Sequence, residues 1–276
     1  MNTPLVTVMM SVFNEEKYVK DAIECILNQT YGDFEFIIIN DYSTDRSLEI
    51  CESFKDPRIR IHSKTNEPRN LASSRVIAVK MARGEYIITQ DADDICDVTR
   101  IEKQLFKALE KPSKRVVGCQ VLRVEKTGNR IMNVPEKHED IIKGFKRLYN
   151  RTTIVGGTIL APTKLMREFP YRVKFCNMED WDQLLRMHES GKVEFYNIQE
   201  SLYTYFIREK SSLFRTDFLN QNIFLRHCQI MRKKGMAEFD SEEKFLAHLE
   251  KHPLEKIKWF GLKKMIELKL NLKAKI

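Results

Sequence analysis

Short apolar runs rich in β-branched residues recur along the first hundred positions of the chain. They occupy residues 5–13, 34–39, 58–62 and 85–90, and each has the length and composition of a buried strand. Between them, apolar residues recur every three or four positions, which predicts a helix after each of the first three strands. Strands that alternate with helices in this way predict an α/β domain built on a parallel, doubly wound sheet.

The pattern is less regular after residue 112. Apolar runs predict further strands, and helices are expected from about Glu139, from Glu179, and from Phe218 to the end. The predicted strands cover residues 115–124, 154–161, 193–198 and 202–207. We expect one domain made of two halves, followed by a helical basic C-terminal extension, with boundaries at 1–112, 113–215 and 216–276.

Size and cysteine usage limit the class of protein. A chain of 276 residues can bury a substantial core without disulfides. Its six cysteines are widely spaced and form no Cys-x-x-Cys pair, so we expect reduced thiols in a cytosolic protein. No apolar run approaches the roughly 20 residues that a membrane span needs. These features predict a soluble or peripheral protein.

Positive charge is concentrated at the C-terminus. The chain has a formal net charge of +8, and residues 253–276 hold seven lysines against two glutamates, a net charge of +5. Apolar residues alternate with these lysines, which suits either a basic helix packed on its own domain or attachment to an anionic membrane surface at the cytoplasmic face. Basic residues are not interleaved with aromatic ones along the chain, so nucleic acid is not an expected partner.

Polar clusters follow three of the predicted strands. They are Asn14-Glu15, Asn40-Asp41 and the segment from Asp91 to Asp94. Open α/β sheets bind ligands at the carboxyl ends of their strands, so these clusters should meet at one edge. The ten glycines form neither G-x-G-x-x-G nor a Walker loop, and a bound nucleotide would need another source of positive charge.

Asp91 and Asp93 offer the hard oxygen ligands that Mg²⁺ or Mn²⁺ prefers, in the pattern Asp-x-Asp after a buried strand. The alternative is structural. Asp94 or Asp97 could cap the helix predicted over residues 98–109.

Several segments, in order, resemble the family 2 glycosyltransferases with the GT-A fold. The resemblance covers Val6 to about Arg100, is local around residues 150–210 and is absent after about 215. Its motifs are Val6–Glu15, Ile26–Tyr31, Phe34–Asp45, Ala82–Ile87, Asp91–Asp94 and Met178–Asp182. It implies a mostly parallel sheet with helices on both faces. Tyr42 departs from the family, which commonly has glycine there, and Glu209 lies where relatives often carry histidine.

The resemblance also implies a donor site. Asp93 would ligate Mn²⁺ or Mg²⁺ together with Asp91, which would also face the ribose. The implied nucleotide-binding residues are Ser11, Phe13, Glu15, Asp41, Arg75, Asp91 and Ala92. Two of these have structural alternatives, since Asp41 could form an Asx turn or cap the next helix, and Arg75 could be a helix-surface arginine.

For catalysis, the resemblance implies that Asp180 is the base that takes the acceptor proton. Glu179 would raise the pKa of Asp180 or orient the acceptor. Alternatively, these two acids only open a helix. A loop containing Arg208, Lys210 and Ser212 would close over the diphosphate.

The implied activity is nonprocessive, inverting transfer of a hexosyl or N-acetylhexosaminyl group. The donor would be a nucleoside-diphosphate sugar, with UDP-sugar preferred, and the acceptor a hydroxyl of a glycan or lipid-linked molecule in cell-surface polysaccharide assembly. A sugar nucleotidyltransferase should have a glycine-rich loop where this chain has Phe13-Asn14-Glu15. A noncatalytic nucleotide-sugar-binding protein would not need both Asp93 and Asp180.

Overall fold

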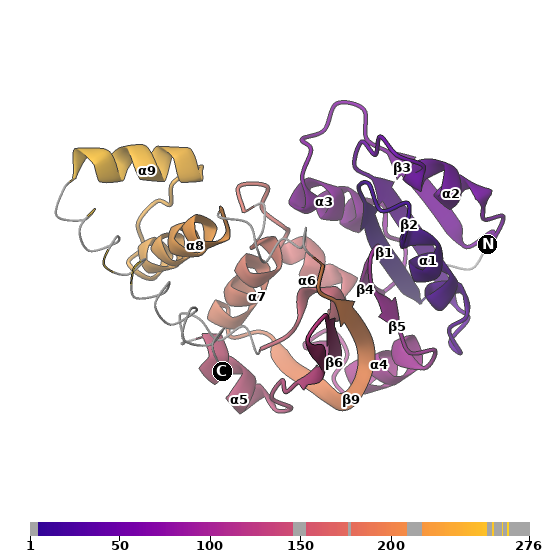
Figure 1. Cartoon of the computed structure of the whole chain (residues 1–276). Coiled ribbons are helices and arrows are strands. Elements are labelled where there is room, and N and C mark those ends of the chain that lie inside the picture. Colours follow the sequence, from indigo (N-terminus) through magenta and orange to yellow (C-terminus); the bar gives the residue numbers. More distant parts are fainter. Residues whose placement is uncertain are drawn as a thin grey trace. The chain divides into compact units, whose positions relative to one another are not determined.

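A computed structural model describes residues 5–145, 153–175, 178–208 and 217–252, together with 256, 261 and 264. The chain forms two compact units (Figure 1). The first unit comprises residues 1–173 and 180–208, and the second comprises residues 174–179 and 209–276. Each unit is described by itself.

Within the residues that the structure describes, the first unit is built on a nine-stranded sheet. Its first four strands are parallel in the order β3-β2-β1-β4, which confirms the predicted parallel arrangement. Ser11 lies opposite Asp91 and Val12 opposite Asn40, so the carboxyl ends of β1, β2 and β4 coincide. The bounds are β1 (Val6–Val12), β2 (Phe34–Asn40), β3 (Ile59–Ser63) and β4 (Tyr86–Asp91).

The remaining strands extend this sheet with mixed directions. β8 is antiparallel to both β4 and β6, β6 runs parallel to β9, and both β5 and β7 pair antiparallel with their neighbours. Their bounds are β5 (Ile95–Cys96), β6 (Arg115–Glu125), β7 (Gly128–Met132), β8 (Leu160–Pro162) and β9 (Glu194–Phe206).

Three of the predicted strands have other bounds in the structure. The strands predicted at 193–198 and 202–207 are one strand, β9, because a register irregularity beside Gln120 lets the ladder continue past the exposed polar residues 199–201. The strand predicted at 154–161 is shorter, because Gly156–Thr158 forms the 3₁₀ helix η1.

Helices cover both faces of the sheet, as the GT-A fold requires. Alternate residues of β1 and β2 are buried in one cluster with α1, α2 and α4, whereas α3 packs on the opposite side of these strands and contacts α6. Full burial of each large apolar side chain contributes about 1.5–3 kcal/mol. The bounds are α1 (Val19–Leu27), α2 (Ser47–Ser53), α3 (Leu71–Met81), α4 (Arg100–Leu109), α5 (His138–Phe145), α6 (Thr163–Glu168) and α7 (Glu179–Glu189).

The start of α1 differs from the sequence-based expectation that Asn14 caps it. Asn14 has a φ of 56°, and its Oδ1 accepts hydrogen bonds from the backbone N–H of Thr44 (2.8 Å) and from the Thr44 hydroxyl (3.3 Å). Its side chain is therefore used to join two loops at the carboxyl edge of the sheet. The helix begins only at Val19, after Tyr18, which makes no side-chain cap.

The second unit contains α8 (Asp217–Lys233) and α9 (Glu242–Lys251). Phe224 packs between Phe175 and Phe245, with ring centroids 5.2 and 5.8 Å away. Among the helices that the structure describes, none is long and apolar enough to cross a membrane. Most of the basic segment 253–276 lies outside the described residues.

Candidate functional site

The ends of β1, β2 and β4 bring predicted site residues to one edge. The Asp41 N–H donates to the Val12 carbonyl at 2.8 Å, and Ser11 faces Asp91 across the ladder. In the sheet, β2 lies on one side of β1 and β4 lies on the other. Such a reversal of strand order opens a crevice at the carboxyl edge, where α/β proteins bind ligands.

Asp41 lies in a buried ion pair with Lys64. The Lys64 Nζ is 2.8 Å from Asp41 Oδ1 and also donates to the carbonyls of Pro68 and Asn70. Lys64 has no solvent-exposed side-chain surface. It was missed by the sequence analysis, and its one signal was a lysine directly after the third strand.

The structural alternatives for Asp41 are wrong. Asn40 makes the local turn, because its Oδ1 accepts from the Ser43 N–H at 3.1 Å, and Asp45 accepts from the Ser47 N–H at the start of α2. Tyr42 takes the left-handed conformation that glycine would adopt, with a φ of 62°, and its hydroxyl donates to the Glu67 carbonyl at 3.0 Å.

Arg75 projects from α3 toward Asp91. Its Nη2 lies 3.4 Å from Asp91 Oδ1, and its guanidinium is 5.5 Å from the centroid of the Tyr171 ring. The side chain is only 7% exposed, so the alternative of a helix-surface arginine is wrong. Arg75 instead orients the carboxylate that ends β4.

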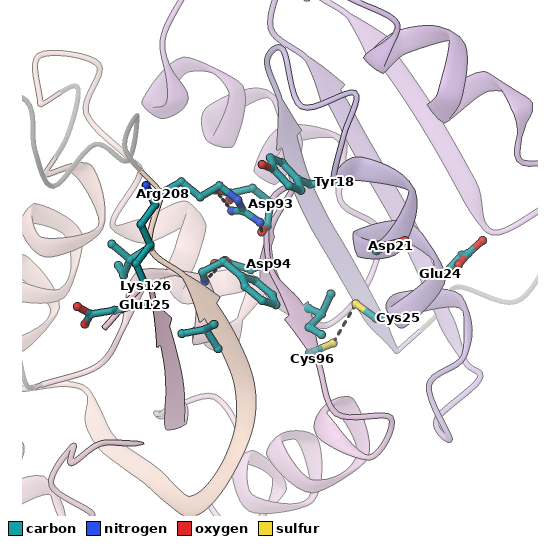
Figure 2. A pocket seen from close by; sticks show the side chains of 14 residues that line it. Tyr18, Asp21, Glu24, Cys25, Asp93, Asp94, Cys96, Glu125, Lys126 and Arg208 are labelled. Atoms are coloured by element: carbon teal, nitrogen blue, oxygen red, sulfur yellow. Dashed lines mark hydrogen bonds and ion pairs between the residues drawn. The ribbon is translucent and has the colours of Figure 1, made fainter. Parts of the chain in front are cut away.

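Asp93 faces Arg208, which follows β9. Arg208 donates to Asp93 Oδ2 at 2.7 Å and to the Asp93 carbonyl at 2.5 Å, and its guanidinium lies 3.7 Å from the centroid of the Tyr18 ring. These residues line a cavity of about 690 Å³ (Figure 2). Lys210 and Ser212, predicted to act with Arg208, lie outside the described residues.

Negative charge accumulates around Asp93. Burial, followed by repulsion from Asp91, raises the pKa of Asp93 to about 6. Burial also raises the pKa of Glu15 to about 7, with further contributions from Asp93, Asp45 and Asp91 that Arg208 partly offsets. Phe13 lies two residues before Glu15, and its ring centroid is 4.0 Å from the Arg69 guanidinium. Ala92, between Asp91 and Asp93, is buried.

Asp94 is structural, but in a way that differs from the expected cap. It is 1% exposed, its Oδ1 accepts from the Phe206 N–H at 3.0 Å, and burial raises its pKa well above its usual range. Asp97 instead accepts from the Thr99 N–H at 2.8 Å, immediately before α4. Asp94 therefore fastens the end of β9 beside Asp93.

The donor set fits a hard divalent cation. Asp91 and Asp93 supply carboxylate oxygens. Burial, followed by repulsion from Asp91, raises the pKa of Asp93, and a bound cation would offset both effects. Within the described ranges, no three His, Cys, Asp or Glu side chains are placed to share one metal ion. Mg²⁺ is commonly held by one or two carboxylates with substrate phosphate oxygens, and that arrangement needs no third acidic ligand.

Asp180 and Asp91 pack against consecutive glycines of η1. A Cβ on Gly156 would collide with Asp180 Oδ2, and a Cβ on Gly157 would lie 2.7 Å from Asp91 Oδ2 and 2.6 Å from the Tyr203 hydroxyl. Real Cβ atoms essentially never come that close. Only glycines let both carboxylates approach this short segment.

Hydrogen bonds from Thr89 and Arg100 hold the two glycines in place beside β4. The Thr89 hydroxyl donates to the Gly156 carbonyl at 2.7 Å, and Arg100 donates to the carbonyls of Gly157 (2.8 Å) and Thr89 (2.7 Å). Arg100 is fully buried. The sequence analysis did not assign a role to these residues; the Gly-Gly pair was the signal that could have identified them.

The two predicted catalytic acids open α7, as the structural alternative expected. Asp180 Oδ1 accepts from the Trp181 N–H at 2.6 Å, and Glu179 is buried. Asp182, two residues on, forms ion pairs with Arg172 and Arg186 and is fully buried. Asp180 is less enclosed than Asp182, and it is the acid of this segment that faces η1.

Comparisons with known proteins agree with this architecture. The family model described as glycosyl transferase family 2 matches residues 7–172. An uncharacterized glycosyltransferase of Methanocaldococcus jannaschii is 34% identical over 219 residues, covering 77% of this chain and 74% of that protein. Glycosyltransferase GlyG of Streptococcus pneumoniae is 31% identical over 227 residues, covering 78% and 74%.

Solved structures share the fold at low sequence identity. TarS of S. aureus (residues 1–349), solved with UDP-GlcNAc, superposes with a TM-score of 0.63 at 19% identity; the match covers 82% of this chain and 66% of that one. The mannosyltransferase PcManGT of Pyrobaculum calidifontis, solved with GDP-Man and Mn²⁺, gives 0.61 at 14% identity and covers 86% and 66%. The chain thus spans just under two thirds of these solved proteins and belongs to glycosyl transferase family 2, with the GT-A fold.

Proposed function

We propose that this glycosyltransferase moves one hexosyl or N-acetylhexosaminyl group from a nucleoside-diphosphate sugar, preferably a UDP-sugar, to an acceptor hydroxyl with inversion. The acceptor is a glycan or lipid-linked molecule in cell-surface polysaccharide biosynthesis. One observation carries the proposal. Asp91, on the donor side, and Asp180, on the acceptor side, pack against the adjacent glycines Gly156 and Gly157.

On the donor side, we assign the nucleotide to the crevice at the ends of β1, β2 and β4. Asp41 accepts a hydrogen bond from the base, and the buried Lys64 holds the Asp41 carboxylate in place. Arg75 orients Asp91 toward the ribose. Ser11 and Phe13 line the approach from β1.

Asp93, together with Asp91, would hold Mn²⁺ or Mg²⁺. A cation bound there supplies the positive charge that stabilises the departing nucleoside diphosphate. Support comes from the accumulated negative charge around Asp93 and from PcManGT, which was solved with Mn²⁺. Arg208 forms an ion pair with Asp93 and, in this proposal, also interacts with the diphosphate.

Asp180 acts as the base in this proposal. Its carboxylate accepts the proton of the acceptor hydroxyl as that oxygen attacks the anomeric carbon of the donor. The close contact with Gly156 limits where the carboxylate can lie. In this proposal Glu179, which directly precedes Asp180 in sequence, orients the acceptor. Holding a base and a donor at fixed positions accounts for much of the rate gain in such reactions.

Thermal-shift measurements with a panel of nucleotide sugars test the donor assignment. UDP-glucose, UDP-galactose, UDP-GlcNAc and GDP-mannose are each added with Mn²⁺ and with EDTA, and UDP and GDP serve as controls. A ligand that binds the folded chain raises the melting temperature, so one donor should give a Mn²⁺-dependent shift. The proposal fails if no nucleotide sugar stabilises the chain under either condition.

We also propose that the enzyme works at the cytoplasmic face of a membrane, to which residues 253–276 attach. Their net charge of +5 supports this, because each Lys near an anionic surface contributes about 1 kcal/mol. Co-sedimentation with phosphatidylglycerol vesicles, compared with phosphatidylcholine vesicles, tests it. Equal binding to both would contradict an electrostatic attachment.

A further inference from the structure

Two thiols meet on one wall of the cavity beside Asp93. Cys25 lies on α1 and Cys96 on β5, 71 residues apart in sequence, yet their sulfur atoms are 3.6 Å apart (Figure 2). This contact is not used by the proposed transfer reaction. A pair of thiols brought together by the fold raises the question of what chemistry the pair supports.

The distance between the two sulfur atoms suits a pair of reduced thiols that can be oxidised to a disulfide. A disulfide requires the sulfurs to approach to about 2.05 Å with Cβ atoms about 3.5–4.5 Å apart. The observed 3.6 Å is thus about 1.5 Å longer than the bond. Because α1 packs directly against β5, rotation of the two side chains can close much of this gap.

The surroundings of Cys96 favour the thiolate, which is the reactive form of cysteine. Its hydrogen bond with Cys25, followed by the nearby positive charge of Arg100, lowers the pKa of Cys96 to about 7 against the opposing effect of burial. The same contact and burial raise the pKa of Cys25. Arg100 donates hydrogen bonds to neutral oxygens, on Gln90, Gln104 and two backbone carbonyls.

Small reagents have a route to the pair. Cys25 is partly exposed, and both cysteines line the cavity of about 690 Å³ that also contains Asp93 and Arg208. Cys51 provides a contrast, because it is 1% exposed and burial raises its pKa to about 12. Exposure and thiolate character together decide which cysteines are oxidised.

We propose that Cys25 and Cys96 form a site of reversible disulfide formation that responds to peroxides. The Cys96 thiolate attacks a peroxide oxygen, and the O–O bond breaks to give a sulfenic acid and, after protonation, water. The Cys25 sulfur then attacks the sulfenic sulfur, and the hydroxyl leaves with the thiol proton as a second water. Two thiols lose two electrons to one hydrogen peroxide, which becomes two water molecules.

The bond would join α1 to the strand that directly follows Asp93 and Asp94. It would therefore fix one wall of the cavity in which Arg208 pairs with Asp93. The cross-link forms without donor or acceptor, so its test is independent of the proposed transferase activity.

Peptide mapping of the full chain tests the proposal. The native protein is treated with hydrogen peroxide, quenched, denatured in iodoacetamide, digested and analysed by mass spectrometry with and without dithiothreitol. We expect one linked species joining the peptides of Cys25 and Cys96, lost on reduction, while Cys51 is recovered alkylated.

Variants separate a specific bond from general oxidation. Cys25→Ser and Cys96→Ser should each abolish the linked species, whereas Cys51→Ser, checked to melt at a similar temperature, should retain it. Recovery of both Cys25 and Cys96 as single alkylated or sulfinic residues after peroxide treatment would overturn the proposal. So would a linked species that persists in Cys25→Ser and contains Cys96 joined to another cysteine of the chain.

Discussion

Arg208 donates hydrogen bonds to both the side chain and the backbone carbonyl of Asp93, at 2.7 and 2.5 Å, while its guanidinium lies over the ring of Tyr18. The carboxylate assigned to the metal is therefore already paired with a cation of the chain itself. A guanidinium and a divalent ion cannot both approach the same carboxylate oxygen closely, so the two should compete.

Replacing Arg208 by Gln should strengthen Mn²⁺ binding in the absence of donor. The substitution removes the competing charge, and partly exposed ion pairs are worth up to about 1 kcal/mol, which corresponds to a gain of up to about fivefold in affinity. Electron paramagnetic resonance of free Mn²⁺ measures the change. Arg46→Gln, which breaks the exposed pair with Glu49, is the matched control and should leave the affinity unchanged. An unchanged affinity in the Arg208 variant would contradict competition.

Asp93→Ala and Asp180→Asn should separate donor binding from transfer. Without Asp93, the Mn²⁺-dependent thermal shift by the donor should disappear. With Asp180→Asn, that shift should persist while the transfer rate falls by about 10²–10⁴, the usual contribution of a positioned base. Radiolabelled sugar transfer to an identified acceptor checks the second result, and near-normal transfer by Asp180→Asn would show that another group is the base.

Gly157→Ala should disrupt the site through steric conflict. The new Cβ would lie 2.7 Å from Asp91 Oδ2 and 2.6 Å from the Tyr203 hydroxyl, so the segment must shift. Overpacking of this kind costs about 1–3 kcal/mol, and donor binding should weaken with it. Gly32→Ala is the control, because a Cβ there meets nothing within 4 Å. Urea denaturation and donor titration of both variants provide the comparison.

Lys64→Met should destabilise the fold and weaken nucleotide binding. The change leaves Asp41 buried without its cation, and breaking a buried pair in this way costs about 3–5 kcal/mol. The double variant Lys64→Met, Asp41→Asn should recover part of the stability but not the nucleotide affinity. If the single variant were as stable as the parent chain, the ion pair would have no structural role.

The raised pKa of Glu15 predicts how stability depends on pH. Its pKa of about 7 in the folded chain exceeds the ordinary value of 4.5, so the folded state binds more protons than the unfolded state between these values. Stability should therefore fall as the pH rises from about 4.5 to 7. Glu15→Gln should reduce this slope in metal-free buffer, measured by denaturation at several pH values. A slope identical to that of the parent would show that other groups cause it.

Sequence patterns identified the parts of the fold that depend on local periodicity. The four parallel strands and the carboxyl edge that gathers Asp41 and Asp91 follow from buried strands alternating with helices. Residues whose role depends on contacts distant in sequence were not found. Lys64 was missed because its partner, Asp41, lies 23 residues away. Asn14 was predicted to cap a helix, but its side chain instead accepts a hydrogen bond from Thr44.

Contacts between residues distant in sequence also limited what could be predicted about the acids of the site. Asp91, Asp93 and Asp180 stood out as carboxylates after a strand or at the start of a helix. The Gly-Gly pair is a local signal of a close backbone approach, but the sequence did not indicate that Gly156 and Gly157 lie between two of these acids, since that relationship arises only when η1 packs beside β4. The assigned catalytic roles of these residues remain predictions for the experiments above.

Arg100 has a consequence for how relatives of this enzyme can diverge. A guanidinium shielded from solvent ties Gly157 to the strand that ends at Asp91, so the spacing between Asp91 and Asp180 is set inside the protein and not by a bound ligand. Residues on the rim of the crevice do not fix this spacing. Under the proposed function, substitutions there would alter which sugar or acceptor is accepted while Asp91 and Asp180 keep their separation.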